Sequence, residues 1–210
     1  MNKKIAAVLL SAVFIFPAQS NATESSANVS LVSNYVFRGQ TQTDDGAAVQ
    51  GGYDIQQSKD KGWYAGAWGS NVDKGLEIDL YGGWKGTFGD KNNLGYDVGA
   101  VVYQYTDSVY TDITEIYAGM SYETAYAKVY FGNGSGISSY NYIDLGASFV
   151  VMKDIDLDLH FGHLSKPSIN DVSATLSTEV KGYDLGLGLT FEDSRDDFEF
   201  FVTVGKSFDL

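Results

Sequence analysis

The chain has 210 residues, of which 27 are acidic and 14 are Lys or Arg, and its formal net charge is −13. A protein surface of that charge repels nucleic acid, so we expect no nucleic-acid partner. Cysteine is absent, which excludes a disulfide framework. The 24 Gly, 15 Tyr and 12 Phe residues, with only two Pro, are typical of membrane β-barrels.

Residues 1–22 predict a secretory signal peptide. The basic start "MNKK" precedes the apolar run "IAAVLLSAVFIF", and "SNA" supplies a small-residue cleavage site after Ala22. The apolar run is too short for a transmembrane helix. Residues 23–210 would then form one domain with a net charge of −15, because Lys3 and Lys4 leave with the signal and 12 basic residues remain against 27 acidic ones.

From Ser30 onward, apolar and polar residues alternate with a period of two, which predicts strands rather than helices. Each strand is close to the 9–11 residues that a tilted strand needs to cross a bilayer. We therefore expect an all-β, antiparallel up-and-down transmembrane barrel of about 12 strands. Eleven strands would remain if 170–192 were not divided at Lys181-Gly182. The expected strands are 29–40, 46–57, 62–72, 75–87, 93–105, 112–123, 124–133, 140–152, 154–165, 170–180, 183–192 and 197–208.

The connections between these strands alternate in length. Short ones such as "MKD" and "VKG" follow even-numbered strands, whereas "TQTDDG" and "GNGSGISS" (132–139) follow odd-numbered ones; the tight "VDKG" after the third strand is an exception. Bacterial barrels have short periplasmic turns and longer outer loops. Together with the signal peptide, this pattern predicts the outer membrane as the location.

One face of most predicted strands is free of charge. In 75–87, Leu76 and Ile78 alternate with Glu77 and Asp79. A Lys or Arg on the lipid face at mid-depth costs about 2–4 kcal/mol, so we assign the charge-free face to lipid and the other face to the lumen. In the strand 62–72, the aromatic residues leave the two faces undecided.

The closing stretch "TVGKSFDL" resembles the C-terminal signal by which barrel proteins are recognised for assembly. Gly205, Phe208 and Leu210 would carry that signal, although Leu210 stands where Phe or Trp is usual. We accordingly expect two partners, the lipids of the outer membrane and the barrel-assembly machinery.

Several segments resemble the TorF porin family, which is also described as a proteobacterial family of unknown function. They are "SNYVFRGQTQTDDGAAVQGGYDI" (33–55), "GWYAGAWGSNVD" (62–73), "IDLYGGW" (78–84) and "YDVGAVVYQY" (96–105), and the closing "GKSF" (205–208) looks similar too. The resemblance implies an outer-membrane barrel with a porin role and no assigned substrate. It supplies no catalytic residues.

The lumen face carries far more acid than base. Its cations on strands are expected to be Arg38 and Lys128. A negative potential in a narrow tube favours cations over anions, so we predict a pore for small, preferentially cationic or neutral solutes. The expected acidic lumen residues are Asp54, Glu77, Asp79, Asp97, Glu115, Asp144, Asp156, Asp158, Asp184 and Glu199.

Arg38, within "SNYVFRG", is the conspicuous cation of the first predicted strand. Facing inward, its guanidinium can pair bidentately with a carboxylate. Arg38 and Lys128 could form one wall of a constriction whose field orients solutes, or they could form ion pairs that fill a narrow barrel. Eight strands enclose an interior that side chains just fill and sixteen leave an aqueous channel, so both interpretations stay open at twelve.

Two other functions are considered. The barrel could be non-conducting, with a structural or partner-binding role. Alternatively, "HLS" places His163 and Ser165 on the lipid-facing wall, an arrangement similar to that of outer-membrane phospholipases and lipid A deacylases, with Asn170 or Asp171 to orient the imidazole. The longer motifs of those enzymes are missing. We therefore expect no enzymatic activity, no cofactor and no metal site.

Overall fold

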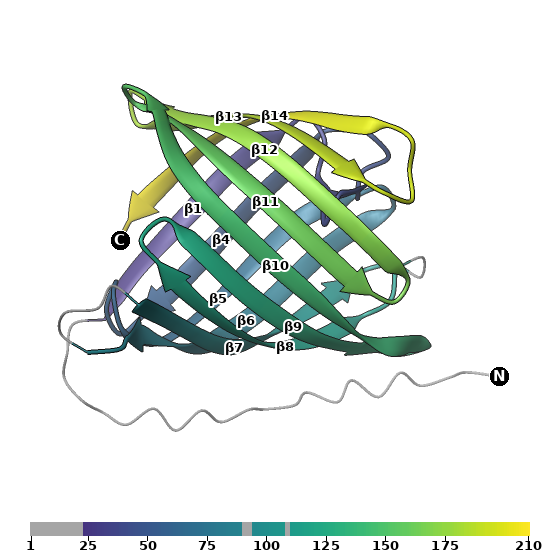
Figure 1. Cartoon of the computed structure of the whole chain (residues 1–210), viewed down its shortest axis with the longest axis horizontal. Helices are drawn as coiled ribbons and strands as arrows, with labels where there is room; N and C mark the ends of the chain where they lie inside the picture. The colour runs from purple at the N-terminus through teal and green to yellow at the C-terminus, as the bar shows by residue number, and fades with distance from the viewer. Residues whose placement is uncertain (1–22, 90–93, 108–109) are drawn as a thin grey trace.

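A computed structural model describes residues 23–89, 94–107 and 110–210; the predicted signal peptide lies outside this part. Twelve strands form one closed antiparallel barrel, in which each strand pairs with the next and β14 closes against β1 (Figure 1). In the described ranges, no helix is long and apolar enough to cross a membrane. The barrel strands are β1 (Glu24–Val32), β4 (Ala48–Gln56), β5 (Gly62–Val72), β6 (Gly75–Thr87), β7 (Leu94–Tyr105), β8 (Ile113–Tyr122), β9 (Ala125–Gly134), β10 (Ile137–Met152), β11 (Ile155–Ser165), β12 (Ser168–Val180), β13 (Tyr183–Glu192) and β14 (Phe198–Asp209).

The predicted fold class and the count of twelve strands are confirmed. Lys181 and Gly182, with φ of 55° and 76°, form the two-residue turn that separates β12 from β13. The start of β1 and the end of β14 consequently lie at the same end of the barrel. We call this the terminal end, and the opposite end, where the chain leaves β1, the loop end.

Two predicted boundaries are wrong. The long connection 132–139 shrinks to residues 135–136, because β9 and β10 extend into it. The first predicted strand, 29–40, is also incorrect, since the wall strand β1 ends at Val32 and the chain turns into the barrel.

The assignment of faces agrees with the exposure of the side chains. On β6, Leu76, Ile78 and Leu80 are exposed, whereas Glu77 and Asp79 are buried. The outward residues of β10 and β14 are likewise exposed and apolar. On β5, the hydroxyl of Tyr64 reaches a lumen carboxylate, so this strand turns Tyr64, Gly66, Trp68 and Ser70 inward.

Glycine and tyrosine face each other across many strand pairs. Tyr140 lies opposite Gly132, and Tyr126 opposite Gly146. In each pair the ring covers the glycine so closely that a Cβ there would collide with it. The same arrangement links Tyr81 with Gly66, Tyr64 with Gly83, Tyr117 with Gly99, and Tyr96 with Gly86. The high glycine and tyrosine content thus reflects flat rings packed against the inner wall.

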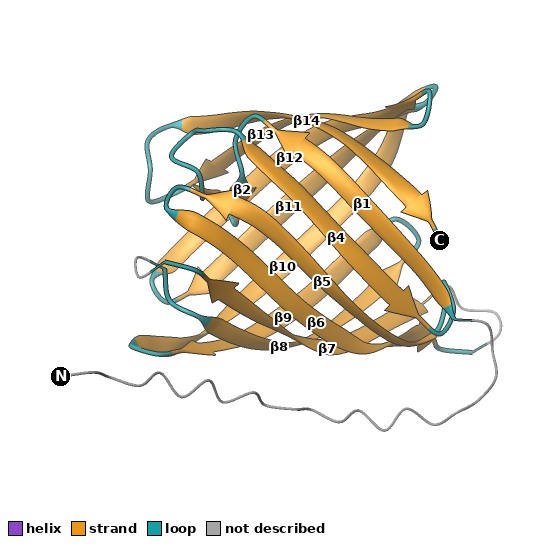
Figure 2. Ribbon diagram, turned by 180° about the vertical axis from the view of Figure 1, so that it is seen from behind, coloured by secondary structure: helices purple, strands orange, loops and turns teal. Residues whose placement is uncertain are grey.

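A small hairpin, β2 (Val36–Phe37) and β3 (Gln40–Thr41), interrupts the connection between β1 and β4. Figure 2 shows β2 near the end of the barrel opposite the C-terminus. Its turn consists of Arg38 and Gly39, both with positive φ, 49° and 78°. Side chains from three regions of the wall contact this turn, so the hairpin is folded into the lumen.

Candidate functional site

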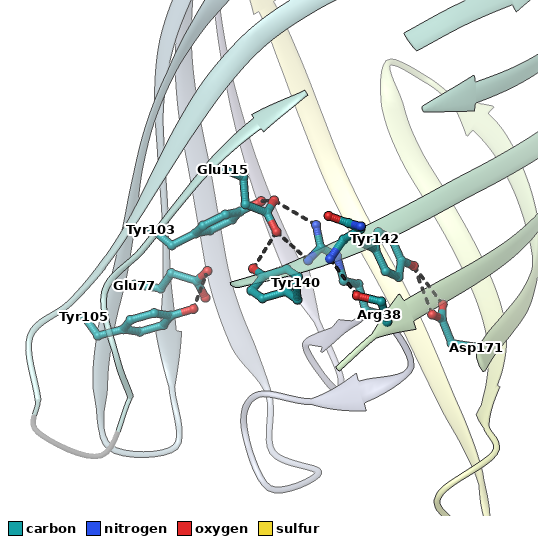
Figure 3. A network of polar contacts seen from close by, with 10 residues as sticks. Arg38, Glu77, Tyr103, Tyr105, Glu115, Tyr140, Tyr142 and Asp171 are labelled. Atoms are coloured by element: carbon teal, nitrogen blue, oxygen red, sulfur yellow. Dashed lines mark hydrogen bonds and ion pairs between the residues drawn. The ribbon is translucent and has the colours of Figure 1, made fainter. Parts of the chain in front are cut away.

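Arg38 is the centre of the lumen network, although it lies on the hairpin turn and not on a wall strand as predicted. Its guanidinium donates two parallel hydrogen bonds to Glu115 of β8, of 2.7 and 2.9 Å (Figure 3). Glu115 is fully buried and also accepts hydrogen bonds from Tyr103 and Tyr140, at 3.0 and 2.6 Å. Burial disfavours the charge of Arg38, but the hydrogen bonds and the charge of Glu115 outweigh it and raise the pKa of Arg38.

Aromatic rings hold the same guanidinium from the sides. Its central carbon lies 4.0 Å from the ring centre of Tyr142, 4.7 Å from Phe37 and 5.1 Å from Tyr130. Such cation–π contacts add to the bidentate ion pair. The side chain of Arg38 is therefore fixed in one position across the lumen.

The rest of the connection is tied to the wall by polar contacts. Asn34 donates to Asp45 at 3.0 Å and to Glu199 of β14 at 3.2 Å, and it accepts from Thr41 at 2.7 Å. Gly39 lies so close to β12 and β13 that a Cβ would be 2.8 Å from Cβ of Glu192. Only glycine fits this position, because it supplies both the positive φ and the close approach.

Beside the hairpin turn, His160 of β11 lies between two aspartates. Its Nε2 is 2.7 Å from Asp171, and its Nδ1 is 3.1 Å from Asp144. Tyr142 donates to Asp171 at 3.0 Å. This cluster and Arg38 line the same cavity, and the guanidinium of Arg38 stacks on the ring of Tyr142.

Three cavities occur at successive depths in the lumen. Along β10 they reach Ile137–Tyr140, then Tyr142 and Asp144, then Asp144 alone, and their volumes are about 670, 240 and 480 Å³. Phe37, Arg38 and Asp171 line both the first and the second cavity, and Asp144 lines both the second and the third. We call them the loop-end, middle and terminal-end cavities.

The remaining predicted lumen residues lie on the inner face but differ in their surroundings. Lys128 pairs with Asp97 at 2.8 Å in the terminal-end cavity. The two predicted cations thus bind separate carboxylates at different depths and do not form one wall. Asp54 accepts from Tyr81 at 2.5 Å, Asp158 from Ser148 and Ser177, Glu77 from Tyr105, and Glu199 pairs with Arg195 at 2.9 Å. Asp156 and Asp184 are exposed at the terminal end.

The structure places the candidate hydrolase residues only partly together. His163 Nδ1 is 2.9 Å from Asn170 Oδ1, and the Asn170 amide donates to Asp193 at 2.6 Å. Ser165 instead accepts a hydrogen bond from the backbone N–H of Asn141 at 2.8 Å. Among the described contacts, none joins His163 to Ser165, so the pairing of nucleophile and base that this chemistry requires is not formed.

The sequence did not reveal the hairpin or the cluster around His160. The Arg-Gly turn was the available signal for the hairpin, but Asn-Gly or Asp-Gly is the usual pair at such turns. Among the described residues, no group of three or more His, Asp or Glu side chains could hold a metal ion.

The architecture defines the class of protein: a closed twelve-stranded β-barrel of the outer-membrane type, with a hairpin folded into its lumen. The chain belongs to the bacterial family Gcw_chp, whose members have unknown function and whose family model matches residues 17–202. The name TorF stays a prediction. No curated protein sequence matches the chain.

Solved structures of similar fold include outer-membrane channels. The KdgM porin has a TM-score of 0.62 at 8% identity, covering 87% of this chain and 99% of its own. The KdgM porin in complex with disordered oligogalacturonate has a TM-score of 0.59 at 7% identity, and the match covers 89% of this chain and 99% of the porin. An outer membrane channel from Pseudomonas putida has a TM-score of 0.52 at 10% identity, and the match covers 93% of this chain and 100% of the channel. At these identities the similarity establishes the fold alone.

Proposed function

We propose that this protein is an outer-membrane channel for small, neutral polar or cationic solutes. The observation that carries the proposal is the succession of three cavities inside a closed barrel, in which neighbouring cavities share lining residues. A solute would pass beside the hairpin turn, through the space that Arg38, Asp144 and His160 line. The middle cavity has the smallest volume on this path, about 240 Å³.

The outer surface supports a membrane location. Large apolar side chains are exposed around the barrel, including Leu80, Phe149, Phe161, Leu187 and Phe200. Such a belt is costly in water and favourable in lipid. We also propose that Gly205, Phe208 and Leu210 are recognised by the barrel-assembly machinery; Phe208 and Leu210 are exposed at the terminal end.

The charges that line the path favour weak selectivity. The cavities are lined by four carboxylates and four Lys or Arg side chains, besides His160: Asp60, Asp97, Asp144 and Asp171 against Arg38, Lys85, Lys128 and Lys166. This near balance suits neutral polar solutes. The wider carboxylate excess of the lumen adds a negative potential, from which we expect cations to pass more readily than anions.

The test is single-channel recording of the refolded chain 23–210 in planar bilayers, with the reversal potential measured under a KCl gradient. We expect stable conductance steps and a modest cation preference. Asp144→Asn should reduce that preference, because Asp144 lines both the middle and the terminal-end cavities. Asp158→Asn is the matched control, since Asp158 lines none of the three cavities.

Three results would contradict the proposal in different ways. A folded barrel that never conducts would exclude the channel and favour the non-conducting alternative. Anion preference would contradict the proposed class of solute but not the proposal that the protein is a channel. An equal effect of Asp144→Asn and Asp158→Asn would mean that the ion path does not follow the three cavities.

A further inference from the structure

Two buried carboxylates on β6 have no counter-charge in the described structure. Glu77 and Asp79 lie two residues apart on the lumen face and are 1% and 9% exposed. Neither Oε2 of Glu77 nor Oδ1 of Asp79 has a hydrogen-bond partner. Within the described ranges, the ion pairs of 4.0 Å or less involve neither residue. Arg38, Lys128 and His160 bind other carboxylates and Lys85 donates to Gln56, so the two carboxylates stand apart from these contacts.

The surroundings of this carboxylate pair offer oxygen ligands. Tyr105 of β7 donates to Oε1 of Glu77 at 3.1 Å (Figure 3). Ser70 is the residue opposite Glu77 on β5. From the loop, the ring of Tyr35 packs edge-on against Trp68 at 5.5 Å. Burial, the charges of Glu77 and Asp79, and a side-chain interaction with Glu77 raise the pKa of Tyr35.

A buried carboxylate without a partner is unfavourable, and an unsatisfied buried oxygen in a native protein requires a physical explanation. Protonation of both carboxyls would remove the two charges, but it would give neither unpartnered oxygen a hydrogen-bond partner. A divalent cation held between the two side chains would neutralise both charges and supply both oxygens with a partner. Ca²⁺ and Mg²⁺ prefer hard oxygen ligands and complete their coordination with water where the protein supplies few groups.

We propose that Glu77 and Asp79 bind a divalent alkaline-earth cation, which ties the inserted loop to the wall at β6. Tyr35 and Tyr105 complete the polar shell from the loop and from β7. The site is separate from the solute path, because neither carboxylate lines any of the three cavities. The proposal therefore does not depend on conduction.

The first test uses Tb³⁺ as a luminescent substitute for Ca²⁺ on the refolded chain 23–210 in detergent. Tyrosine excitation should sensitise Tb³⁺ bound at this site, and Ca²⁺ or Mg²⁺ should displace it. Glu77→Gln combined with Asp79→Asn should abolish that displaceable signal. Asp54→Asn is the control, because Asp54 is a lumen carboxylate with its own donor, Tyr81, at 2.5 Å.

A second measurement needs no variant. A cation that binds only the folded barrel raises the thermal midpoint, and saturating Ca²⁺ should do so relative to a chelator. Equal midpoints in Ca²⁺ and in chelator would overturn the proposal. It would also be overturned if the double variant kept the full displaceable Tb³⁺ signal, or if that signal disappeared equally in Asp54→Asn.

Discussion

Individual tyrosines in the lumen do two things at once. The flat ring of Tyr140 covers Gly132, and its hydroxyl reaches Glu115 at 2.6 Å. Likewise Tyr126 covers Gly146 and donates to Asp144 at 2.9 Å. A glycine beneath the ring lets it lie flat, so that the hydroxyl satisfies a carboxylate one or two strands away. The lumen is consequently lined by tyrosine–carboxylate pairs, in which most of the negative charge is hydrogen-bonded.

Gly132→Ala should destabilise the barrel by about 1–3 kcal/mol, since a methyl group would force the Tyr140 ring off the wall. The free energy of unfolding, measured with urea on the refolded protein, tests this expectation. Gly205→Ala is the control, because a Cβ there meets its nearest atom only at 3.4 Å. Equal stability of the two variants would mean that the ring does not need the glycine.

At the scale of elements, the hairpin narrows the lumen, because Phe37 and Arg38 line both the loop-end and the middle cavity. β2 and β3 are two residues each and gain little from their own pairing. Their position depends instead on the ion pair between Arg38 and Glu115, on the contacts of Asn34 and on the close approach of Gly39. Breaking these contacts should free the hairpin while leaving the twelve wall strands paired.

Glu115→Gln should cost about 3–5 kcal/mol, because it leaves the buried guanidinium of Arg38 without a negative partner. Arg38→Met combined with Glu115→Gln should cost less than the sum of the two single changes, since neither charge is then left unpaired. A double-mutant cycle by urea unfolding measures this coupling. Additive losses would show that the ion pair does not hold the hairpin.

The connection between β13 and β14 provides a pH-dependent contact. Hydrogen bonds from the backbone and the side chain of Asn170, at 2.9 and 2.6 Å, lower the pKa of the exposed Asp193. Asp193 therefore stabilises this connection above the ordinary Asp pKa, about 3.9, and the contribution disappears as the pH falls through the lowered value.

Hydrogen exchange at the Asn170 amide should accordingly become faster, relative to its intrinsic rate, when the pH is lowered through the depressed pKa of Asp193. In Asp193→Asn the protection should not change across that pH range. Constant protection in the unchanged protein would contradict the assigned role of Asp193.

Most wall strands were predictable because they obey a period of two that lipid enforces, and the charges of β6 or β11 reveal directly which face points into the lumen. The inserted hairpin was not predictable in the same way. "YVFRGQT" continues the alternation past Val32, and an Arg-Gly pair is a weak turn signal next to Asn-Gly. Arg38 was correctly expected to meet carboxylates inside the barrel. Its partner Glu115 and the cluster at His160 depend on contacts between distant strands, which local patterns do not encode.

For the whole molecule, the distribution of connections predicts an orientation. The inserted connection from Val32 to Ala48 lies at the loop end, and both termini of the described barrel lie at the other. In bacterial barrels the longer loops face outward and the short turns face the periplasm. We therefore expect the loop-end cavity to open to the exterior and the cavity lined by Lys128 to open to the periplasm.

The absence of cysteine makes this orientation directly measurable. Lys74 lies in the turn between β5 and β6 at the loop end, and Lys153 lies in the turn between β10 and β11 at the terminal end; both are exposed. In intact cells, a membrane-impermeant maleimide should label Lys74→Cys, whereas Lys153→Cys should react only after the outer membrane is permeabilised. Since both are lysines in tight, solvent-exposed turns, a difference in labelling reports the side of the membrane and not local reactivity. Labelling of Lys153→Cys alone in intact cells would mean that the barrel has the opposite orientation. Labelling of neither variant in intact cells would contradict the outer-membrane location.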